Sequence, residues 1–216
     1  MNSDNSSTSN PLLVGSEQSA PARKRPKPGE RRVQILQALA EMLENPQGER
    51  VTTAALAAKI QVSEAALYRH FASKAQMFDG LIAFIEQSIF GLINQIIAKE
   101  DDGQKQIYEI AMMLLAFSEK NPGMTRVLLG DSLFQEDARL QERINQVLER
   151  VEASLKQSFR ILQTQHQSNW VTEDIGQRSA LIMAVVIGRW HRFARSGFTK
   201  SPLDNAPASL KVLLFA

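Results

Sequence analysis

The feature that most constrains the fold is a pair of short amphipathic segments separated by a turn of two residues. Thr52-Thr53 places hydroxyl groups before an apolar-periodic stretch over residues 54–60, and Ser63 does the same before residues 64–71. Hydroxyl side chains favour helix N-caps because they accept a hydrogen bond from an otherwise unpaired amide of the first turn. Gln61-Val62 is therefore predicted to form a tight turn between two short helices. This spacing is typical of a helix-turn-helix over about residues 52–71.

The rest of the chain has the same helical periodicity. Apolar residues recur three and four positions apart from about residue 30 to a stop at Asn45-Pro46, and similar segments follow the motif. No stretch alternates polar and apolar residues as a strand would. The sequence therefore predicts an all-α protein of about nine helices, the later ones over residues 74–99, 104–120, up to 129, 136–163, 172–195 and after Pro207.

Three regions are expected. Residues 1–29 are rich in Ser, Asn, Pro and Lys/Arg without a sustained period, which predicts a disordered basic arm. Residues 30–78 are assigned to the domain with the helix-turn-helix, and residues 79–216 to a C-terminal helical bundle for dimerisation and partner binding. The near-heptad spacing over residues 136–163 resembles a coiled coil. An antiparallel dimer bundle gives the same pattern and is preferred, because no run of four clean heptads exists.

Charge is concentrated at the N-terminus. The first 32 residues hold six Lys or Arg against three Asp or Glu, a net charge of +3, so the remainder of this +2 chain carries −1. A basic arm on a near-neutral body suits a partner with a localised negative field, such as the phosphates of double-stranded DNA. The alternative is that the basic run is only a solvated tail.

Composition excludes several other classes of protein. The chain has no cysteine, so disulfides, thiol nucleophiles and Cys-ligated metals cannot form, which suits a reducing cytosol. The first twenty residues lack an apolar export signal. The longest strongly apolar run, over residues 180–187, is far shorter than the ~20 residues needed to cross a bilayer. We expect a cytoplasmic protein without a membrane span.

One face of the second short helix carries the candidate DNA contacts. Packing Leu67 inward leaves an opposite face made of Ala65, Tyr68, Arg69 and Ala72. Small residues let a helix sit deep in the major groove, and Arg on guanine is the commonest base-specific contact. Two helix N-termini add further contacts. Those at Thr52-Thr53 and at Ser73-Lys74 offer amides, hydroxyl groups and a cation to phosphate. The alternatives are that these hydroxyl residues merely cap helices and that Tyr68 is a half-buried core residue.

These residues carry a resemblance to a known family. The runs TTAALA at 52–57, VSEAALYRHF at 62–71 and SK at 73–74 resemble the N-terminal domain of TetR-family regulators. The resemblance implies DNA contact by the first three helices and the start of the fourth, palindromic sites, and a homodimer formed by the last two long helices. The implied DNA-binding residues are Thr52, Thr53, Ser63, Glu64, Ala65, Tyr68, Arg69, His70 and Lys74.

A closer resemblance covers about residues 31–160. The segments ILQ at 35–37, NPG at 121–123 and RINQ at 143–146 are similar to a branch of the TetR family whose members act at the nucleoid as antagonists of the division protein FtsZ. This resemblance implies FtsZ as a partner, with Phe84, Lys120 and Asn121 at its site. Lys120 stands where the family usually has Arg. Lysine keeps the positive charge but lacks the planar guanidinium group that can donate two hydrogen bonds to one carboxylate. A ligand-responsive repressor is the alternative function.

The helix over residues 74–99 holds more apolar side chains than one core-facing stripe requires. Part of that surface is therefore expected to form a groove that includes Phe84. The alternative is that Phe84 belongs to the core.

Catalytic and metal-binding motifs do not fit the pattern. The tetrapeptide GDSL at 130–133 spells a hydrolase tag with Ser132 as nucleophile, but no Asp-x-x-His follows to supply the base. His70, His166 and His191 lie far apart, without ligand spacing beside them. We expect no catalytic residues, no metal, no cofactor and no enzyme activity.

Overall fold

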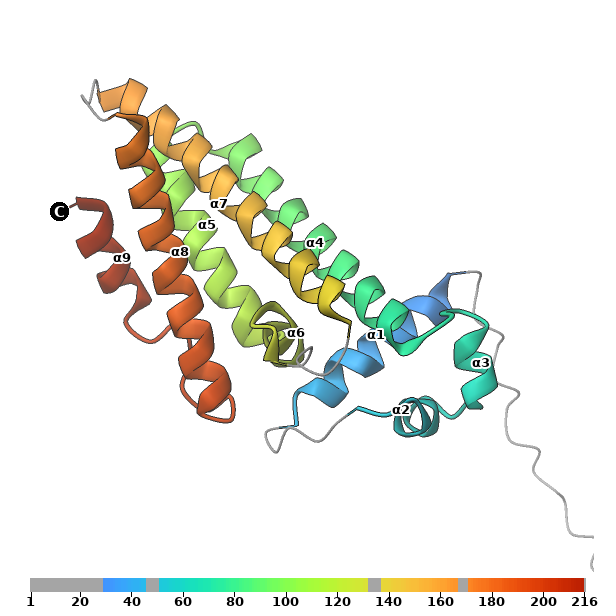
Figure 1. The fold of residues 1–216 in the computed structure, drawn as a ribbon. Coiled ribbons are helices and arrows are strands. Elements are labelled where there is room, and N and C mark those ends of the chain that lie inside the picture. Colours follow the sequence, from blue (N-terminus) through green and yellow to red (C-terminus); the bar gives the residue numbers. More distant parts are fainter. Residues whose placement is uncertain (1–28, 46–50, 132–136, 167–170, 216) are drawn as a thin grey trace, which may run out of the picture.

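The computed structural model describes residues 29–45, 51–131, 137–166 and 171–215 (Figure 1). These residues form nine α-helices and no strand, which confirms the all-α prediction. The helices are α1 Glu30–Leu43, α2 Thr53–Lys59, α3 Glu64–Tyr68, α4 Lys74–Lys99, α5 Gly103–Lys120, α6 Pro122–Leu128, α7 Ala138–His166, α8 Thr172–Arg195 and α9 Ala206–Phe215. The arm predicted over residues 1–29 lies outside the described residues, apart from Gly29.

Two predicted helix ends were wrong by three residues. The third helix was expected to reach Phe71 but ends at Tyr68, because the amides of His70 and Phe71 both donate to the carbonyl oxygen of Leu67. This shared acceptor closes the helix with a tight last turn. The helix predicted over 136–163 extends three residues further, to His166.

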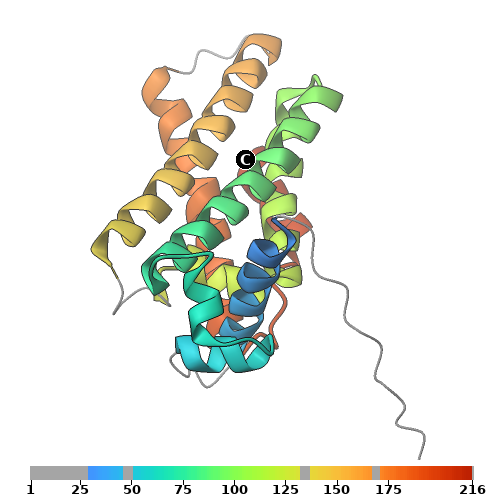
Figure 2. The same ribbon diagram turned by 90° about the vertical axis from the view of Figure 1, so that its right-hand side faces the viewer.

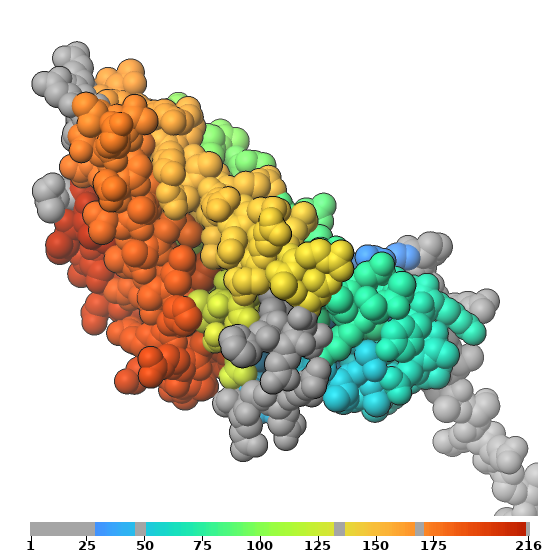
Figure 3. Space-filling model, in the orientation of Figure 1, coloured from blue at the N-terminus to red at the C-terminus, as the bar shows by residue number. Residues whose placement is uncertain are grey.

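The N-terminal lobe packs α1 against the two short helices. Leu56 of α2, Leu67 of α3 and Phe71 are buried with Ile35 and Leu39 of α1. In the space-filling view, α2, α3 and the start of α4 form a lobe at one end of the molecule, away from α8 and α9 (Figure 3). The lobe therefore presents its short helices to solvent at the end of the molecule.

The larger lobe is a bundle in which α5 contacts α4, α7, α8 and α9 (Figures 1 and 2). Trp190 of α8 is fully buried, and its Nε1 donates to the Leu114 carbonyl oxygen at 3.3 Å. A buried indole N–H needs such an acceptor. The bundle thus holds α5 in a fixed position between α4 and α8.

Helix α4 joins the two lobes and runs unbroken through residue 78. Within the described residues it is the one helix long and apolar enough to cross a membrane by length and composition. Its apolar side packs against α1, α5 and α7, with Met77, Phe78, Leu81, Ile82, Ile85, Ile89 and Ile93 buried. This side of α4 therefore belongs to the core.

The short helix α6 fixes the first lobe to the second. It contacts α1, α4, α5 and α8. At Gly123 an added Cβ atom would lie 1.9 Å from the carbonyl oxygen of Ala40 in α1, a separation that real Cβ atoms essentially never show. Only glycine fits there, so the two helices approach with backbone against backbone.

Candidate nucleic-acid interface

The helix-turn-helix is set by side-chain caps and one left-handed residue. The Thr52 hydroxyl accepts from the Ala55 amide at 3.1 Å, and the Ser63 hydroxyl accepts from the Ala66 amide at 3.2 Å. Between the two helices Gln61 has a φ of 56°, in the left-handed region. A left-handed residue after the last turn of a helix ends it sharply. The caps and this turn place α3 across α2.

The outer face of α3 is open to solvent. Ala65, Tyr68, Arg69 and His70 are all exposed, and the Tyr68 side chain retains 46% of its accessible area. The alternative in which Tyr68 belongs to the core is therefore wrong. An exposed tyrosine beside arginine and a small residue is a suitable surface for phosphates and base edges.

Two predicted DNA contacts bind each other instead of pointing separately outward. The Thr53 hydroxyl donates to Glu64 Oε2 at 2.6 Å and so joins the start of α2 to the start of α3. A charge-assisted bond of this length is among the stronger kinds. It also gives the exposed Glu64 carboxylate a partner within the motif. Thr53 and Glu64 therefore brace the motif in this structure.

Arg32 is a residue whose position sequence reasoning missed. It was counted only in the net charge of the first 32 residues, yet its Nη1 donates to the carbonyl oxygen of His70 at 3.0 Å. Its guanidinium also lies 4.1 Å above the ring centroid of Phe71. The pairing spans 38 residues, so no local pattern could have revealed it. Arg32 fastens α1 to the end of the candidate recognition helix.

The start of α4 is capped on two sides. The Ser73 hydroxyl accepts from the Gln76 amide at 3.1 Å, and the Gln76 side-chain oxygen accepts from the Ala72 amide at 2.8 Å. The sequence did carry a signal for Gln76, because Ser followed three residues later by Gln is a capping-box pattern. Lys74 is half-buried, with its ammonium 5.7 Å from the Phe78 ring centroid.

The three predicted partner-site residues lie on α4 and at the end of α5. Phe84 is half-buried and lines a surface groove, so its side chain is neither fully buried in the core nor fully exposed to solvent. Lys120 is exposed, whereas Asn121 is half-buried and its Nδ2 donates to the Phe117 carbonyl oxygen at 2.7 Å. Asn121 thus caps the end of α5, a role that the sequence analysis did not assign.

Two observations concern the catalytic and metal-binding motifs. Ser132, the nucleophile of the GDSL reading, lies outside the described residues. Across the described ranges, no group of three His, Cys, Asp or Glu side chains could hold a metal ion.

Two family models match the chain. The model described as "Bacterial regulatory proteins, tetR family" matches residues 35–81, which include α2, α3 and the start of α4. The model described as "Tetracyclin repressor-like, C-terminal domain" matches residues 101–214, which begin just before α5 and reach into α9. The two matches therefore cover both lobes.

Relatives named "Nucleoid occlusion factor SlmA" match over most of their length. The protein from Vibrio cholerae serotype O1 is 49% identical over 177 residues, which are 81% of this chain and 89% of the relative. The protein from Aliivibrio fischeri strain MJ11 is 48% identical, covering 83% and 92% of the two chains. The protein from a Marinomonas species is 45% identical, covering 87% and 94%.

Solved structures support the fold. The TetR-family regulator PfmR from Thermus thermophilus superimposes with a TM-score of 0.70 at 17% identity, over 84% of this chain and 97% of that one. The regulator AibR, solved with isovaleryl coenzyme A and operator DNA, gives a TM-score of 0.68 at 13% identity, over 85% and 98%. At such low identity these likenesses concern the fold alone. The sequence matches across both lobes establish that this chain belongs to the TetR family and, within it, to the nucleoid occlusion factor SlmA group.

Proposed function

We propose that this chain is a nucleoid occlusion factor that binds palindromic chromosomal sites as a homodimer and antagonises FtsZ assembly over the nucleoid. The observation that carries the proposal is the near-full-length similarity to proteins named nucleoid occlusion factor SlmA, which extends through the C-terminal lobe. Similarity confined to the helix-turn-helix would fit any TetR-type repressor. The proposed place of action is the cytoplasmic nucleoid.

DNA binding is assigned to the exposed face of α3 and the surrounding helix starts. Tyr68, Arg69 and His70 are exposed beside Ala65, whose small side chain leaves room for the groove wall. Arg32 holds this face in place from α1. A recognition helix fixed by the rest of its domain places side chains on bases at little entropic cost. We assign phosphate contacts to Thr52, Ser63 and Lys74 at the starts of α2, α3 and α4.

Dimerisation is assigned mainly to the outer face of α8. Leu181 retains 55% of its accessible area, and Ala180, Ala184 and Gly188 are exposed on the same helix. Small side chains at helical spacing let two helices approach closely. The outer face of α7, by contrast, is mainly polar and charged. A two-fold axis beside α8 would present two recognition helices to a palindrome.

The FtsZ surface is assigned to the apolar side shared by α4 and α5. These helices run antiparallel, so Phe84, fifteen residues before the end of α4, lies level with Ser118, fifteen residues after the start of α5. Lys120 and Asn121 follow directly. The three predicted residues therefore fall at one end of the same helix pair.

A groove of about 390 Å³ lies further along this pair. Its lining includes Leu92, which keeps 37% of its accessible area, and the half-buried Met112 and Met113. Methionine side chains adapt readily to varied apolar partners. We infer that an extended FtsZ segment lies along α4 and α5 with apolar residues in this groove. A carboxylate of that segment would pair with Lys120. The lysine ammonium group offers a compact charge, but it cannot form the paired hydrogen bonds of a guanidinium group.

One set of variants tests the two surfaces separately. We expect Tyr68→Ala or Arg69→Ala to weaken binding to a palindromic duplex at least tenfold, measured by fluorescence anisotropy, with an unchanged circular dichroism spectrum. Arg160→Ala, an exposed cation on α7, is the matched control and should bind like the wild type. Lys74→Ala should lower the slope of log affinity against log salt by about one unit. Equal affinity for wild type and both α3 variants would overturn the DNA assignment.

The partner surface needs a different readout. Lys120→Glu should abolish binding of FtsZ while leaving the affinity for DNA unchanged, because this side chain is exposed on the far lobe. Lys105→Glu, an exposed lysine near the opposite end of α5, is the control for the charge change. If the two variants bind FtsZ equally well, the assignment of the α4–α5 surface is wrong.

A further inference from the structure

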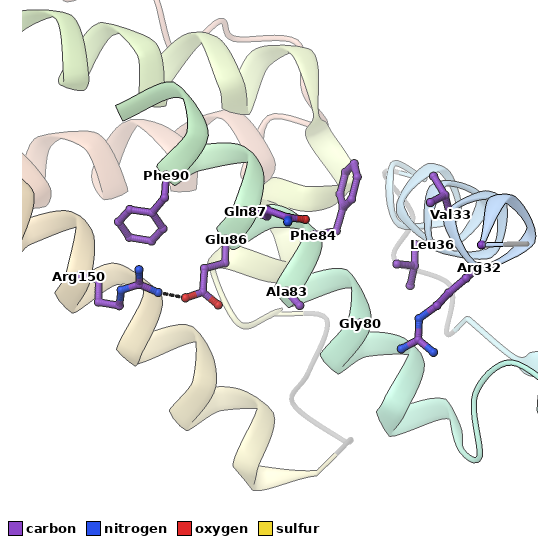
Figure 4. Close-up of a pocket in the computed structure, with 11 residues that line it drawn as sticks. Arg32, Val33, Leu36, Gly80, Ala83, Phe84, Glu86, Gln87, Phe90 and Arg150 are labelled. Carbon is purple, nitrogen blue, oxygen red and sulfur yellow. Dashed lines mark hydrogen bonds and ion pairs between the residues drawn. The ribbon is translucent and has the colours of Figure 1, made fainter. Parts of the chain in front are cut away.

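A second groove lies over the outward face of α4, where no described helix covers it. Its volume is about 560 Å³, and it extends from the start of α1 across α4 to α7 (Figure 4). Gly80 and Ala83 contribute little side-chain bulk to its lining. Its apolar walls include Phe84, Phe90 and Val33, which retains 41% of its accessible area. A groove of this kind can accept two or three aliphatic side chains.

The rim of this groove carries a positive charge. Arg32 lies at the α1 end and Arg150 at the α7 end. Between them, Glu86 pairs with Arg150 and also with Arg143, whose Nη2 is 2.8 Å from Glu86 Oε2. Glu86 is therefore shared by two guanidinium groups, and Arg32 adds a third cation at the other end of the groove. An occupant with aliphatic residues and a nearby carboxylate would complement both features.

The chain itself supplies a segment with this chemistry. Gly29, the first described residue, lines the groove, so residues 1–28 are tethered at its edge. Within those residues, Leu12-Leu13-Val14 is the one run of large aliphatic side chains. Glu17 follows three residues after it. Aliphatic residues with a carboxylate three residues away match an apolar wall that has an arginine at each end.

The tether is long enough for this segment to return to the groove. Fourteen residues separate Val14 from Gly29. Fully extended, they reach about 45 Å. A tether of this length gives an effective concentration in the millimolar range, so even weak docking would be populated.

We propose that residues 12–17 dock in the groove formed by α1, α4 and Arg150 of the same chain. The aliphatic side chains of Leu12, Leu13 and Val14 occupy the apolar wall, and Glu17 pairs with a rim arginine. Because Phe84 lines this groove and also belongs to the proposed FtsZ surface, the docked segment competes with FtsZ there. That consequence rests on the proposed function, whereas the docking itself does not.

The absence of cysteine allows a direct test in the full-length protein. Leu13→Cys is combined with Ala83→Cys inside the groove, or with Ala98→Cys as control. Both alanines are exposed on α4, fifteen residues apart, which is about 22 Å along a helix and within reach of the tether. The rate of disulfide formation is measured in a glutathione buffer at low protein concentration. It is normalised to the reactivity of each single thiol with a small disulfide reagent.

Docking predicts that the Ala83 pair closes at least tenfold faster than the Ala98 pair, within one chain, as seen on a non-reducing gel. Adding Leu12→Asp and Val14→Asp should remove this preference. Equal rates for the two pairs overturn the proposal, as does a preference that survives the Asp substitutions. A disulfide formed mainly between chains would overturn docking within one chain. No FtsZ or DNA is present, so the outcome is independent of the proposed function.

Discussion

Replacing Gly123 by alanine should destabilise the junction between the two lobes. The added Cβ would lie 1.9 Å from the Ala40 carbonyl oxygen and 2.8 Å from its carbonyl carbon. These are backbone atoms of α1, so no side-chain rotation can relieve the clash. The helices α1 and α6 must separate by more than an ångström, which loosens the packing of the buried Val127 and Leu128.

The size of this destabilisation depends on which atoms the added Cβ meets. Overpacking a well-filled core costs typically 1–3 kcal/mol, and a backbone obstacle places Gly123→Ala near the upper end, at about 3 kcal/mol. For a chain of about 200 residues, each kcal/mol lowers Tm by roughly 2–4 °C. We therefore expect Tm to fall by about 6–12 °C, measured by circular dichroism.

A control substitution, also of a glycine by alanine, is expected to change Tm in the opposite direction. Gly91 lies within α4 and has no atom within 4 Å of an added Cβ. Alanine there should stabilise the helix by about 1 kcal/mol, because glycine is a poor helix former. Gly91→Ala is thus expected to raise Tm by about 2–4 °C. If Gly123→Ala melts at or above the wild-type temperature, the proposed close packing of α6 on α1 is refuted.

Three smaller predictions concern single residues. Gln61→Gly should raise Tm by about 2 °C, because glycine adopts the left-handed turn conformation without a steric penalty; a lower Tm would contradict this. Thr53→Val removes the bond to Glu64 and should lower Tm by about 2–4 °C, since such a bond is worth about 1 kcal/mol. Hydrogen bonds from Arg139 lower the pKa of Asp137 from 3.8 to about 2, so the contact favours the folded state above pH 3.8 and is lost as the pH falls toward 2. Arg139→Ala should return this pKa toward 3.8 in an NMR titration, and an unchanged value would show that the pairing is absent in solution.

Local signals were enough to predict most helices. Helix α8 begins at Thr172 and ends at Arg195 as predicted, because an apolar period and a following glycine are both readable in a single sequence. The cap at Ser73 likewise marked the start of α4. The end of α3 was missed because Phe71 continues the apolar period, although the preceding amide, of His70, already bonds only three residues back, to the Leu67 carbonyl oxygen.

Contacts between distant residues could not be predicted in this way. Arg32 and His70 are 38 residues apart, and nothing in either neighbourhood indicates the other. Thr53 and Glu64 were both predicted to face DNA, because surface position follows from helical phase whereas mutual pairing does not. The excess of apolar residues on α4 predicted a groove, but only tertiary packing determines that Phe84 lines one beside α1.

The central claim is tested most directly by the effect of this protein on FtsZ polymers in the presence of DNA. Purified FtsZ is assembled with GTP, and polymer mass is followed by light scattering while the protein is added with a palindromic duplex or a scrambled one. We predict loss of polymer with the wild-type protein on its palindrome, and no loss with the Lys120→Glu variant on the same duplex. If polymers persist when anisotropy shows the wild-type protein fully bound to its palindrome, the division role is wrong and a DNA-binding repressor remains.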